Sequence, residues 1–324
     1  MSAPEVSVIV VTYESAPVLS RCLAQLRAQT FRDFEVILSD NGSTDGAAKA
    51  AARADPSLIL LENGANLGFA EGNNRAARIA GGRWLALLNP DAFAEPDWLE
   101  RLMAATRRHP EVKCFTSLQL AADDPAVLDG AGDTMTSTGL PYRMGWRKPR
   151  PDHIAEGEVF SPCGAAMLIE RETFLELGGF EARFFSYCED VDLGYRLRLA
   201  GGRTRLVPDA VVHHVGSSTL GARSDFAVFH GFRNRIWCFA RNTPGLVLPF
   251  MAVAHLVATL LLLAGYVARG QARPALRGVA AALPEVWRMR REQRGRRGHA
   301  LETLGAMTWS PLKTIRRALD IRPS

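Results

Sequence analysis

The sequence has few cysteines and no regular spacing between them. Of its 324 residues five are cysteine, an odd number spread along the chain. None of them forms the closely spaced pairs that bind zinc or the dense pattern of a disulfide scaffold. We therefore expect a protein of a reducing compartment, in which the thiols serve as small core side chains. The cysteines are Cys22, Cys114, Cys163, Cys188 and Cys238.

Two glycine patterns that bind phosphates are also missing. The stretch 66–74 contains glycine and asparagine, but it lacks the spacing of a dinucleotide-binding loop or of a P-loop. A dehydrogenase of the Rossmann type is therefore not supported. Residues 1–6 contain neither basic side chains nor a long apolar run, so we expect no signal peptide.

Charge is distributed unevenly along the chain. Residues 269–324 contain thirteen Lys or Arg against four Asp or Glu, a balance of +9. The whole chain carries +5, which leaves −4 for the first 268 residues. The basic character therefore concerns the partner of the tail and not that of the main domain. The arginines of 288–297 have no aromatic residues between them, so nucleic acid is not an expected partner.

The first half of the chain alternates between apolar strands and helices. Apolar runs typical of buried strands occur at 6–11, 34–38, 58–61 and 85–88, with helical segments between them. This order predicts an α/β fold with a mostly parallel sheet and right-handed crossovers. Residues 119–158 show little periodicity and are rich in Gly, Pro, Asp and Arg, which predicts a long loop that is either functional or mobile.

Polar loops follow three of the predicted strands, at Thr12–Glu14, Asp40–Asp45 and Asn89–Asp91. In a doubly wound sheet such loops meet at one edge and form a single crevice. Pro90 ends strand pairing and leaves a carboxylate at that edge, where it could hold a metal that neutralises phosphates. Taken alone, the Asn89–Asp91 loop is equally consistent with a hydrogen-bonded turn, and the Asp40–Asp45 loop is more typical of one.

Three acidic residues, Glu189, Asp190 and Asp192, lie in the first turn of a helix predicted over 184–200. Carboxylates favour the positive end of a helix dipole, so the pattern alone has a structural explanation. A reaction that deprotonates a hydroxyl would instead use one of them as a general base. His213 and His214 are neighbours on a predicted strand, so one should face a site and the other the core or solvent.

Seven motifs, in register, together resemble glycosyltransferase family 2, and within it the rhamnosyltransferase-type branch. The resemblance covers about residues 5–243 and includes Arg233-Asn-Arg235. The motifs are Val8-Ile-Val-Val-Thr-Tyr13, Ser39-Asp-Asn-Gly-Ser-Thr-Asp-Gly46, Asn66-Leu-Gly-Phe-Ala-Glu-Gly-Asn-Asn74, Leu88-Asn-Pro-Asp91, Gly178-Gly-Phe180, Glu189-Asp-Val-Asp192 and His213. The resemblance implies a GT-A fold and an inverting transfer of a sugar from a nucleotide-sugar to an acceptor hydroxyl.

The resemblance also implies roles for individual residues. Asp190 would be the catalytic base, with Glu189 in the same motif and Asp192 as second choice. Asp91 would hold a divalent cation, Mg²⁺ or Mn²⁺, together with His213, and the adjacent His214 stays an alternative. An amide, Asn89, occupies the place of the first aspartate in the family's Asp-x-Asp, so the metal would rest more on Asp91. The nucleotide pocket would be formed by Thr12, Tyr13, Glu14, Asp40, Asn41, Asn66, Gly68, Phe69, Asn73 and Asn89.

The last part of the chain predicts contact with a membrane. Residues 246–268 contain no charged side chain and are long enough to span a bilayer. A single crossing would export the basic tail from the cytosol, where nucleotide-sugars are found, against the positive-inside tendency. We therefore expect a GT-A domain at 1–243 and a helical appendage at 244–324 that binds peripherally to the cytoplasmic face of the inner membrane. A helix buried against the domain or in a homodimer is the alternative.

These inferences predict a membrane-associated glycosyltransferase of cell-surface polysaccharide or glycolipid assembly. The resemblance points to dTDP-L-rhamnose as donor and to a lipid-linked sugar as acceptor, with acceptor choice assigned to residues 119–158. A UDP-hexose or UDP-galactofuranose donor is the alternative within the same reaction. The alternative outside it is a non-catalytic nucleotide-sugar-binding partner in an assembly complex, and the intact Glu189-Asp190 pair argues against that.

Overall fold

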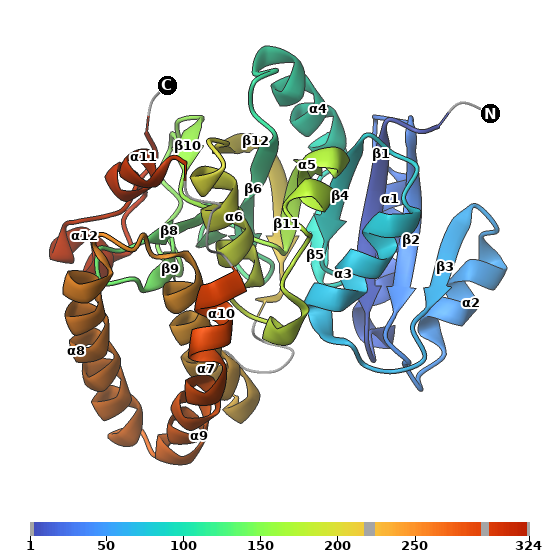
Figure 1. Ribbon diagram of the computed structural model, residues 1–324. Coiled ribbons are helices and arrows are strands. Elements are labelled where there is room, and N and C mark those ends of the chain that lie inside the picture. The colour runs from blue at the N-terminus through green and yellow to red at the C-terminus, as the bar shows by residue number, and fades with distance from the viewer. Residues whose placement is uncertain (1–2, 217–223, 293–297, 323–324) are drawn as a thin grey trace.

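The computed structural model describes residues 3–216, 224–292 and 298–322. A twisted central sheet lies between helices on both faces, and the C-terminal helices gather at one end of the molecule (Figure 1). The strands are β1 (Val6–Thr12), β2 (Phe34–Asp40), β3 (Leu58–Glu62), β4 (Trp84–Leu88), β5 (Ala92–Ala94), β6 (Cys114–Ala121), β7 (Leu128–Gly130), β8 (Asp133–Met135), β9 (Pro141–Arg143), β10 (Gly157–Val159), β11 (Ala166–Glu170) and β12 (Thr204–His214).

The sheet has the strand order β10-β12-β6-β11-β4-β1-β2-β3, with β5 paired to β12 and β7 to β6. Neighbouring strands from β4 to β3 pair in parallel, and so do β6 and β12. β11 runs antiparallel between β4 and β6. The predicted α/β class with a mostly parallel sheet is confirmed, and the carboxyl ends of β1, β2 and β4 meet at one edge.

Two layers of helices bury the two faces of the sheet. The helices are α1 (Ala16–Arg27), α2 (Ala47–Ala54), α3 (Gly68–Ile79), α4 (Trp98–Arg108), α5 (Arg171–Glu176), α6 (Glu189–Leu199), α7 (Asp225–Asn242), α8 (Leu248–Val267), α9 (Ala272–Ala282), α10 (Val286–Glu292), α11 (Ala300–Gly305) and α12 (Pro311–Arg316). Because side chains alternate along a strand, Val8 of β1 joins the core under α1 and α4, whereas Ile9 joins the core under α3 and α6.

The structure corrects two local predictions. The helix expected over 184–200 begins at Glu189, and the residues before it form a short 3₁₀ turn (Ala182–Phe184) followed by an irregular loop. The stretch 119–158 is not one long loop. It continues β6 to Ala121 and contains β7, the hairpin of β8 and β9, and β10.

The C-terminal helices pack against the base of the fold through α7. That helix contacts α6, α9 and α10, and Trp237 of α7 shares a buried core with Met251 of α8 and Met289 of α10. The division of the chain at residue 243 stays a prediction. Within the described residues α8 is long and apolar enough to cross a membrane, with a mean hydropathy of 2.1, and α8 and α9 project from the body of the protein as a hairpin (Figure 1).

The α8 helix is mostly exposed. Its buried residues are Met251, His255 and Thr259, and 17% of its most apolar stretch of 18 residues is buried. The alternative of a helix buried against the catalytic part of the same chain is therefore not what the structure shows.

Candidate active site

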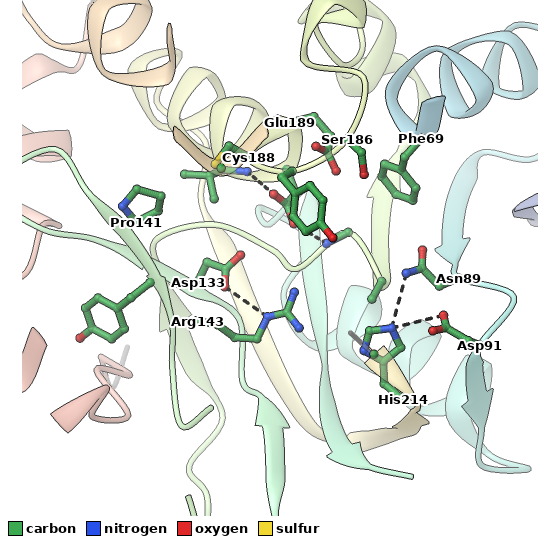
Figure 2. Close-up of a pocket in the computed structure, with 18 residues that line it drawn as sticks. Phe69, Asn89, Asp91, Asp133, Pro141, Arg143, Ser186, Cys188, Glu189 and His214 are labelled. Carbon is green, nitrogen blue, oxygen red and sulfur yellow. Dashed lines mark hydrogen bonds and ion pairs between the residues drawn. The ribbon is translucent and has the colours of Figure 1, made fainter. Parts of the chain in front are cut away.

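A cavity of about 400 Å³ opens at the edge of the sheet where β4 ends. Figure 2 shows side chains from distant parts of the chain that converge on it. Most come from the loop after β4, the hairpin of β8 and β9, the loop that precedes β11, the segment from Ser186 into the first turn of α6, and the end of β12, and Phe69 of α3 joins them. The cavity therefore brings together the motifs around Asn89, Asp190 and His214, which are distant in the sequence.

Asp91 and His214 lie together on one side of the cavity (Figure 2). His214 Nε2 is 3.4 Å from Asp91 Oδ1 and 3.5 Å from the amide nitrogen of Asn89. On the other side of the ring, Nδ1 is 2.8 Å from Asp129 Oδ2. A carboxylate that fixes one imidazole nitrogen while the other faces a second carboxylate is a common arrangement around protein metal ions.

The two histidines point to opposite faces of β12, as predicted, and the geometry favours His214 over His213 as the partner of Asp91. His213 does not line the cavity, and its Nε2 lies 3.0 Å from Glu95 Oε1 on the other side of the strand. The period of two along a strand places His214 on the cavity side. His214 is thus the histidine that could assist Asp91.

The electrostatics of His214 fit a divalent cation. Burial alone would lower the pKa of His214, but hydrogen bonds with Asp129 and Asp91 raise it to about 9. The position therefore favours a positive charge next to Asp91. A divalent cation bound by Asp91 and His214 Nε2 would replace the proton that this environment otherwise holds.

Asp190 lies at the start of α6 and lines the same cavity. Its Oδ2 accepts a hydrogen bond from the backbone N–H of Gly164 at 2.9 Å, and its Oδ1 accepts one from Val191 at 2.8 Å. The loop that contains Gly164 is also bonded to the end of β4, because Asn89 N donates to Ala165 O at 2.9 Å. One short loop thereby fixes the position of Asp190 relative to Asn89.

Glu189 also lines the cavity but has a different electrostatic environment. Burial and the charge of Asp190 hold the pKa of Glu189 well above its usual range. Its Oε2 atom is buried and has no hydrogen-bond partner among the described residues. A buried carboxyl group with a raised pKa is less suited to take up a proton as an ionised base, so Asp190, which is fixed by two backbone N–H groups, is the better candidate.

The structure argues against Asp192 as an alternative base. Asp192 is fully buried and does not line the cavity. Its carboxylate binds Arg196 at 2.7 Å, Arg241 at 3.3 Å and the amide of Asn242 at 2.7 Å. Two residues after Asp190 the helix has turned this side chain toward α7, where it belongs to a buried ion-pair network.

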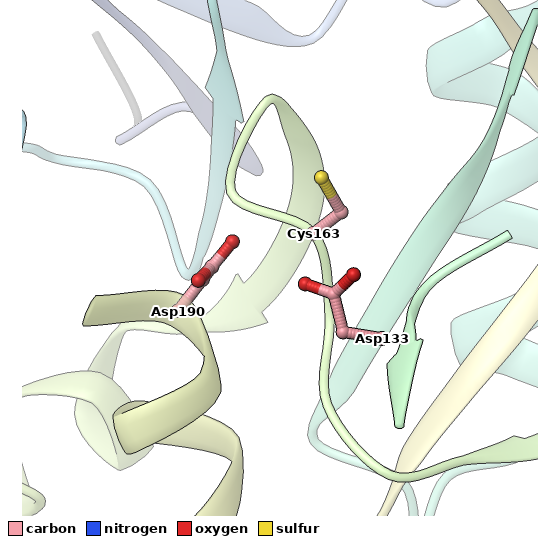
Figure 3. Close-up of side chains that lie close together, drawn as sticks. All are labelled: Asp133, Cys163 and Asp190. Atoms are coloured by element: carbon pink, nitrogen blue, oxygen red, sulfur yellow. The ribbon is translucent and has the colours of Figure 1, made fainter. Parts of the chain in front are cut away.

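Asp190 has two further neighbours, Asp133 and Cys163, whose side chains point toward the same spot (Figure 3). One ligand-type atom of each lies within 4.8 Å of the others. Burial, with the nearby charge of Asp190, raises the pKa of Asp133 to about 7. Burial raises the pKa of the Cys163 thiol to about 12, and the thiol donates to Gln119 Oε1 at 3.4 Å. A protonated thiol is a poor ligand, so this cluster is a weaker candidate cation site than the pair of Asp91 and His214.

Sequence reasoning missed the residues that connect the two sides of the cavity. Asp129 Oδ2, which contacts His214, is also 3.0 Å from Nη1 of Arg143. Nε of Arg143 is in turn 3.8 Å from Asp133, the neighbour of Asp190. These three residues belong to β7, β8 and β9, each three residues long, and so short a strand leaves no readable hydrophobic period.

The loop before Glu189 is strained and is held by a buried asparagine. Phe185, Tyr187 and Cys188 have φ values of 65°, 72° and 67°, which cost of order 1 kcal/mol each for residues other than glycine. The amide nitrogen of Asn234, on α7, lies 2.9, 2.8 and 2.7 Å from the carbonyl oxygens of Phe184, Ser186 and Tyr187. Asn234 is fully buried, so its amide fixes the loop that leads into the acidic motif.

The residues predicted to hold the nucleotide begin beside the cavity and continue along the sheet edge. Thr12 and Asp40 are register partners at the ends of β1 and β2, and Thr12 Oγ1 donates to Asp40 Oδ1 at 3.1 Å. Glu14 accepts from the N–H and the hydroxyl of Thr44 at 2.8 and 3.0 Å. The side chain of Tyr13, which lies between Thr12 and Glu14 in the sequence, is half exposed. Their contacts with a nucleotide stay a prediction.

The loop at the start of α3 connects this edge to the cavity. Gly68 accepts a hydrogen bond from the Asn41 amide at 3.0 Å and donates its N–H to Asn66 Oδ1 at 3.0 Å. Gly68 has φ +77°, and a Cβ there would fall 2.4 Å from Phe185 O, so only glycine fits. Phe69 lines the cavity, whereas the buried Asn73 amide donates to Phe69 O. The contact of Asn73 thus stabilises this turn, and its predicted nucleotide contact stays untested.

Comparison with known proteins identifies the family. The model of the family "Glycosyl transferase family 2" matches residues 7–177. The chain is 34% identical over 235 residues to N-acetylglucosaminyl-diphospho-decaprenol L-rhamnosyltransferase from Mycobacterium tuberculosis, a match that covers 65% of this chain and 76% of the relative. The residues that the family model matches include most of β1, all of β2 and β4, and the loop after β4.

Solved structures share the fold at low sequence identity. GalNAc-T7 with UDP, GalNAc and Mn²⁺ superposes with a TM-score of 0.59 at 18% identity, over 74% of this chain and 48% of that one. The mannosyltransferase PcManGT from Pyrobaculum calidifontis with GDP-Man and Mn²⁺ gives a TM-score of 0.56 at 20% identity, over 96% and 87%. The fold is therefore the GT-A fold, and the chain belongs to glycosyltransferase family 2.

Proposed function

We propose that this glycosyltransferase transfers L-rhamnose from dTDP-L-rhamnose, with inversion, to a hydroxyl of a lipid-linked sugar diphosphate. The observation that carries the proposal is a single cavity lined by Asp190 and by the pair of Asp91 and His214. The similarity to a rhamnosyltransferase that is named for a diphospho-decaprenol substrate supports this donor and acceptor. The reaction belongs to cell-surface glycan assembly.

The residues of the cavity suit an inverting displacement. Asp190, fixed by the N–H groups of Gly164 and Val191, would take the proton of the acceptor hydroxyl as that oxygen attacks the sugar. Glu189, whose pKa is held above its usual range by burial and the charge of Asp190, would lie beside it. The diphosphate would lie on the side of Asp91 and His214, away from the base.

We propose that Asp91 and His214 hold the divalent cation, with Asn89 beside them and Asp129 orienting the imidazole. Bound there, Mg²⁺ or Mn²⁺ would offset the negative charge of the leaving diphosphate. The Mn²⁺ in the structures of GalNAc-T7 and PcManGT supports a metal-dependent reaction.

The test of this function is a panel of donors assayed with purified protein and membrane lipid. The donors are dTDP-L-rhamnose, UDP-glucose, UDP-galactose, UDP-galactofuranose and UDP-N-acetylglucosamine, each with and without Mn²⁺, and the acceptor is a polyprenyl-diphospho-N-acetylglucosamine. We expect transfer from dTDP-L-rhamnose alone. Transfer from a UDP-sugar would show that this sugar nucleotide, and not dTDP-L-rhamnose, is the donor. Binding without turnover of any donor would favour the non-catalytic alternative.

The exposed hairpin supports a peripheral place on the cytoplasmic face of the membrane. The α8 helix exposes Phe250 by 80%, Leu261 by 70% and Val253 by 65%. Exposed arginines accompany this apolar surface along the following segment, and each is worth about 1 kcal/mol near anionic lipid. These arginines are Arg269, Arg273, Arg277, Arg288 and Arg291.

We expect the double variant Phe250→Glu and Leu261→Glu to bind vesicles containing 30% phosphatidylglycerol at least about 10-fold more weakly than the wild type, because two apolar side chains no longer enter the lipid. Sedimentation with the vesicles measures the binding. Ile79→Glu, at a half-exposed position on α3, is the matched control. If the wild-type protein does not bind the vesicles and light scattering shows a dimer, the exposed face of α8 would instead be a contact with a second copy of the chain.

A further inference from the structure

The described lining of the cavity combines one permanent cation with several carboxylates. Among the described residues that line it, Arg143 is the one Lys or Arg, whereas Asp91, Asp133, Glu189 and Asp190 are acidic. A sugar diphosphate brings further negative charge into this space. Arginine stays charged at any physiological pH, so its side chain is positioned to balance such a substrate.

The side chain of Arg143 is held in place by its neighbours. Its aliphatic stem runs over Gly130, where an added Cβ would fall 2.6 Å from Arg143 Cδ. Its Nη1 binds Asp129 Oδ2 at 3.0 Å, the same oxygen that contacts His214. The guanidinium is therefore fixed relative to the histidine beside Asp91.

Part of the guanidinium remains available to a ligand. Nη1 contacts Asp129 and Nε is 3.8 Å from Asp133, but Nη2 has no hydrogen bond or ion pair within the described residues. Figure 2 shows the group between Asp133 and His214, inside the cavity. An arginine presents five N–H donors in a planar fork, a geometry that matches phosphate oxygens.

We propose that Arg143 binds a phosphate group of a substrate diphosphate in this cavity. The inference rests on the proposed function for its ligand class, a diphosphate ester. Two substrates carry that chemistry, the nucleotide-sugar donor and the lipid-linked acceptor, and Arg143 lies between the metal side and the base side of the cavity. The hairpin of β8 and β9 thereby contributes a binding residue from the stretch to which acceptor choice was assigned.

The experiment compares Arg143→Gln with Arg147→Gln, an arginine of the same segment whose side chain is half exposed and does not line the cavity. Calorimetry measures the binding of dTDP and of inorganic pyrophosphate in Mn²⁺. Transfer is measured to a polyprenyl-diphospho-sugar and to the same sugar on a neutral alkyl chain. Loss of a charge-assisted bidentate contact should weaken the affected step by about 10- to 100-fold in Arg143→Gln.

The outcomes separate the two sources of phosphate. Weaker dTDP binding assigns Arg143 to the donor, whereas unchanged dTDP binding with a raised KM for the diphospho acceptor alone assigns it to the acceptor. If the Arg143→Gln variant behaves like the Arg147→Gln variant in every measurement of binding and transfer, the proposal is overturned. Mn²⁺ titration without nucleotide controls for an indirect effect through Asp129 and His214.

Two further measurements keep the test decisive. If Arg143→Gln does not fold, Arg143→Lys retains the charge but loses the fork, and a fall of about 5-fold or more in the same step is expected. Unchanged values in that variant overturn the proposal. If the wild type transfers none of the sugars, the proposed function fails, whereas pyrophosphate binding by wild type and variants still decides the role of Arg143.

Discussion

Asp190→Asn should lower kcat for sugar transfer by about 10³-fold, because general bases contribute about 10² to 10⁴ to catalysed rates. Asparagine has the same shape and keeps an oxygen that can accept the N–H of Gly164, but it cannot take a proton. The KM for the donor should stay near the wild-type value. Steady-state kinetics with the donor identified by the panel measure both constants.

Two matched variants sharpen this expectation. Asp209→Asn, at an exposed position on β12, should leave kcat unchanged. Asp192→Asn should act on the fold instead, because breaking a buried pair such as that with Arg196 costs about 3–5 kcal/mol. Full activity in Asp190→Asn, or a large loss of kcat in a stable Asp192→Asn, would transfer the role of base away from Asp190.

Removal of the metal site should be the second large effect. We expect Asp91→Asn and His214→Gln each to lower kcat/KM by about 10²-fold or more and to weaken Mn²⁺ binding, since a divalent ion stabilises the leaving diphosphate by several kcal/mol. Treatment with EDTA should abolish transfer by the wild type, and added Mn²⁺ or Mg²⁺ should restore it. Manganese binding is followed by electron paramagnetic resonance.

The adjacent histidine supplies the control. His213→Gln changes the same chemistry one residue away, but its side chain faces Glu95 and not the cavity. We expect this variant to retain metal affinity and activity within about 2-fold, as is usual for surface substitutions away from a site. If His213→Gln loses the metal while His214→Gln keeps it, the assignment drawn from β12 is wrong.

The parts of the fold that sequence analysis predicted well are those with strong periodicity. β1 and β4 are fully apolar runs because both of their faces are covered by helices, and such runs are unmistakable in a sequence. The same signal placed the polar loops after these strands at one edge, which fixed Asn89 and Asp91 beside the cavity. The thiols of Cys22, Cys114 and Cys238 are buried and unpaired, as expected from their spacing.

The remainder of the site depends on tertiary packing that no local pattern records. Arg143 and Asp133 enter the cavity on three-residue strands, whose partners decide which side chain faces inward. The choice between His213 and His214 likewise required the register of β12 against β5 and β6. A one-residue shift reverses every side chain of a strand, so a motif alone could not decide it.

The three carbonyl contacts of Asn234 limit how this enzyme can be engineered. Asn234 lies on α7, and α7 packs against α9 and α10, which follow the apolar α8 in the sequence. Shortening the chain before α7 to obtain a more soluble protein would release the strained backbone that delivers Asp190. Recoding the exposed face of α8 with polar side chains leaves that support in place, so solubility is better sought by substitution than by truncation.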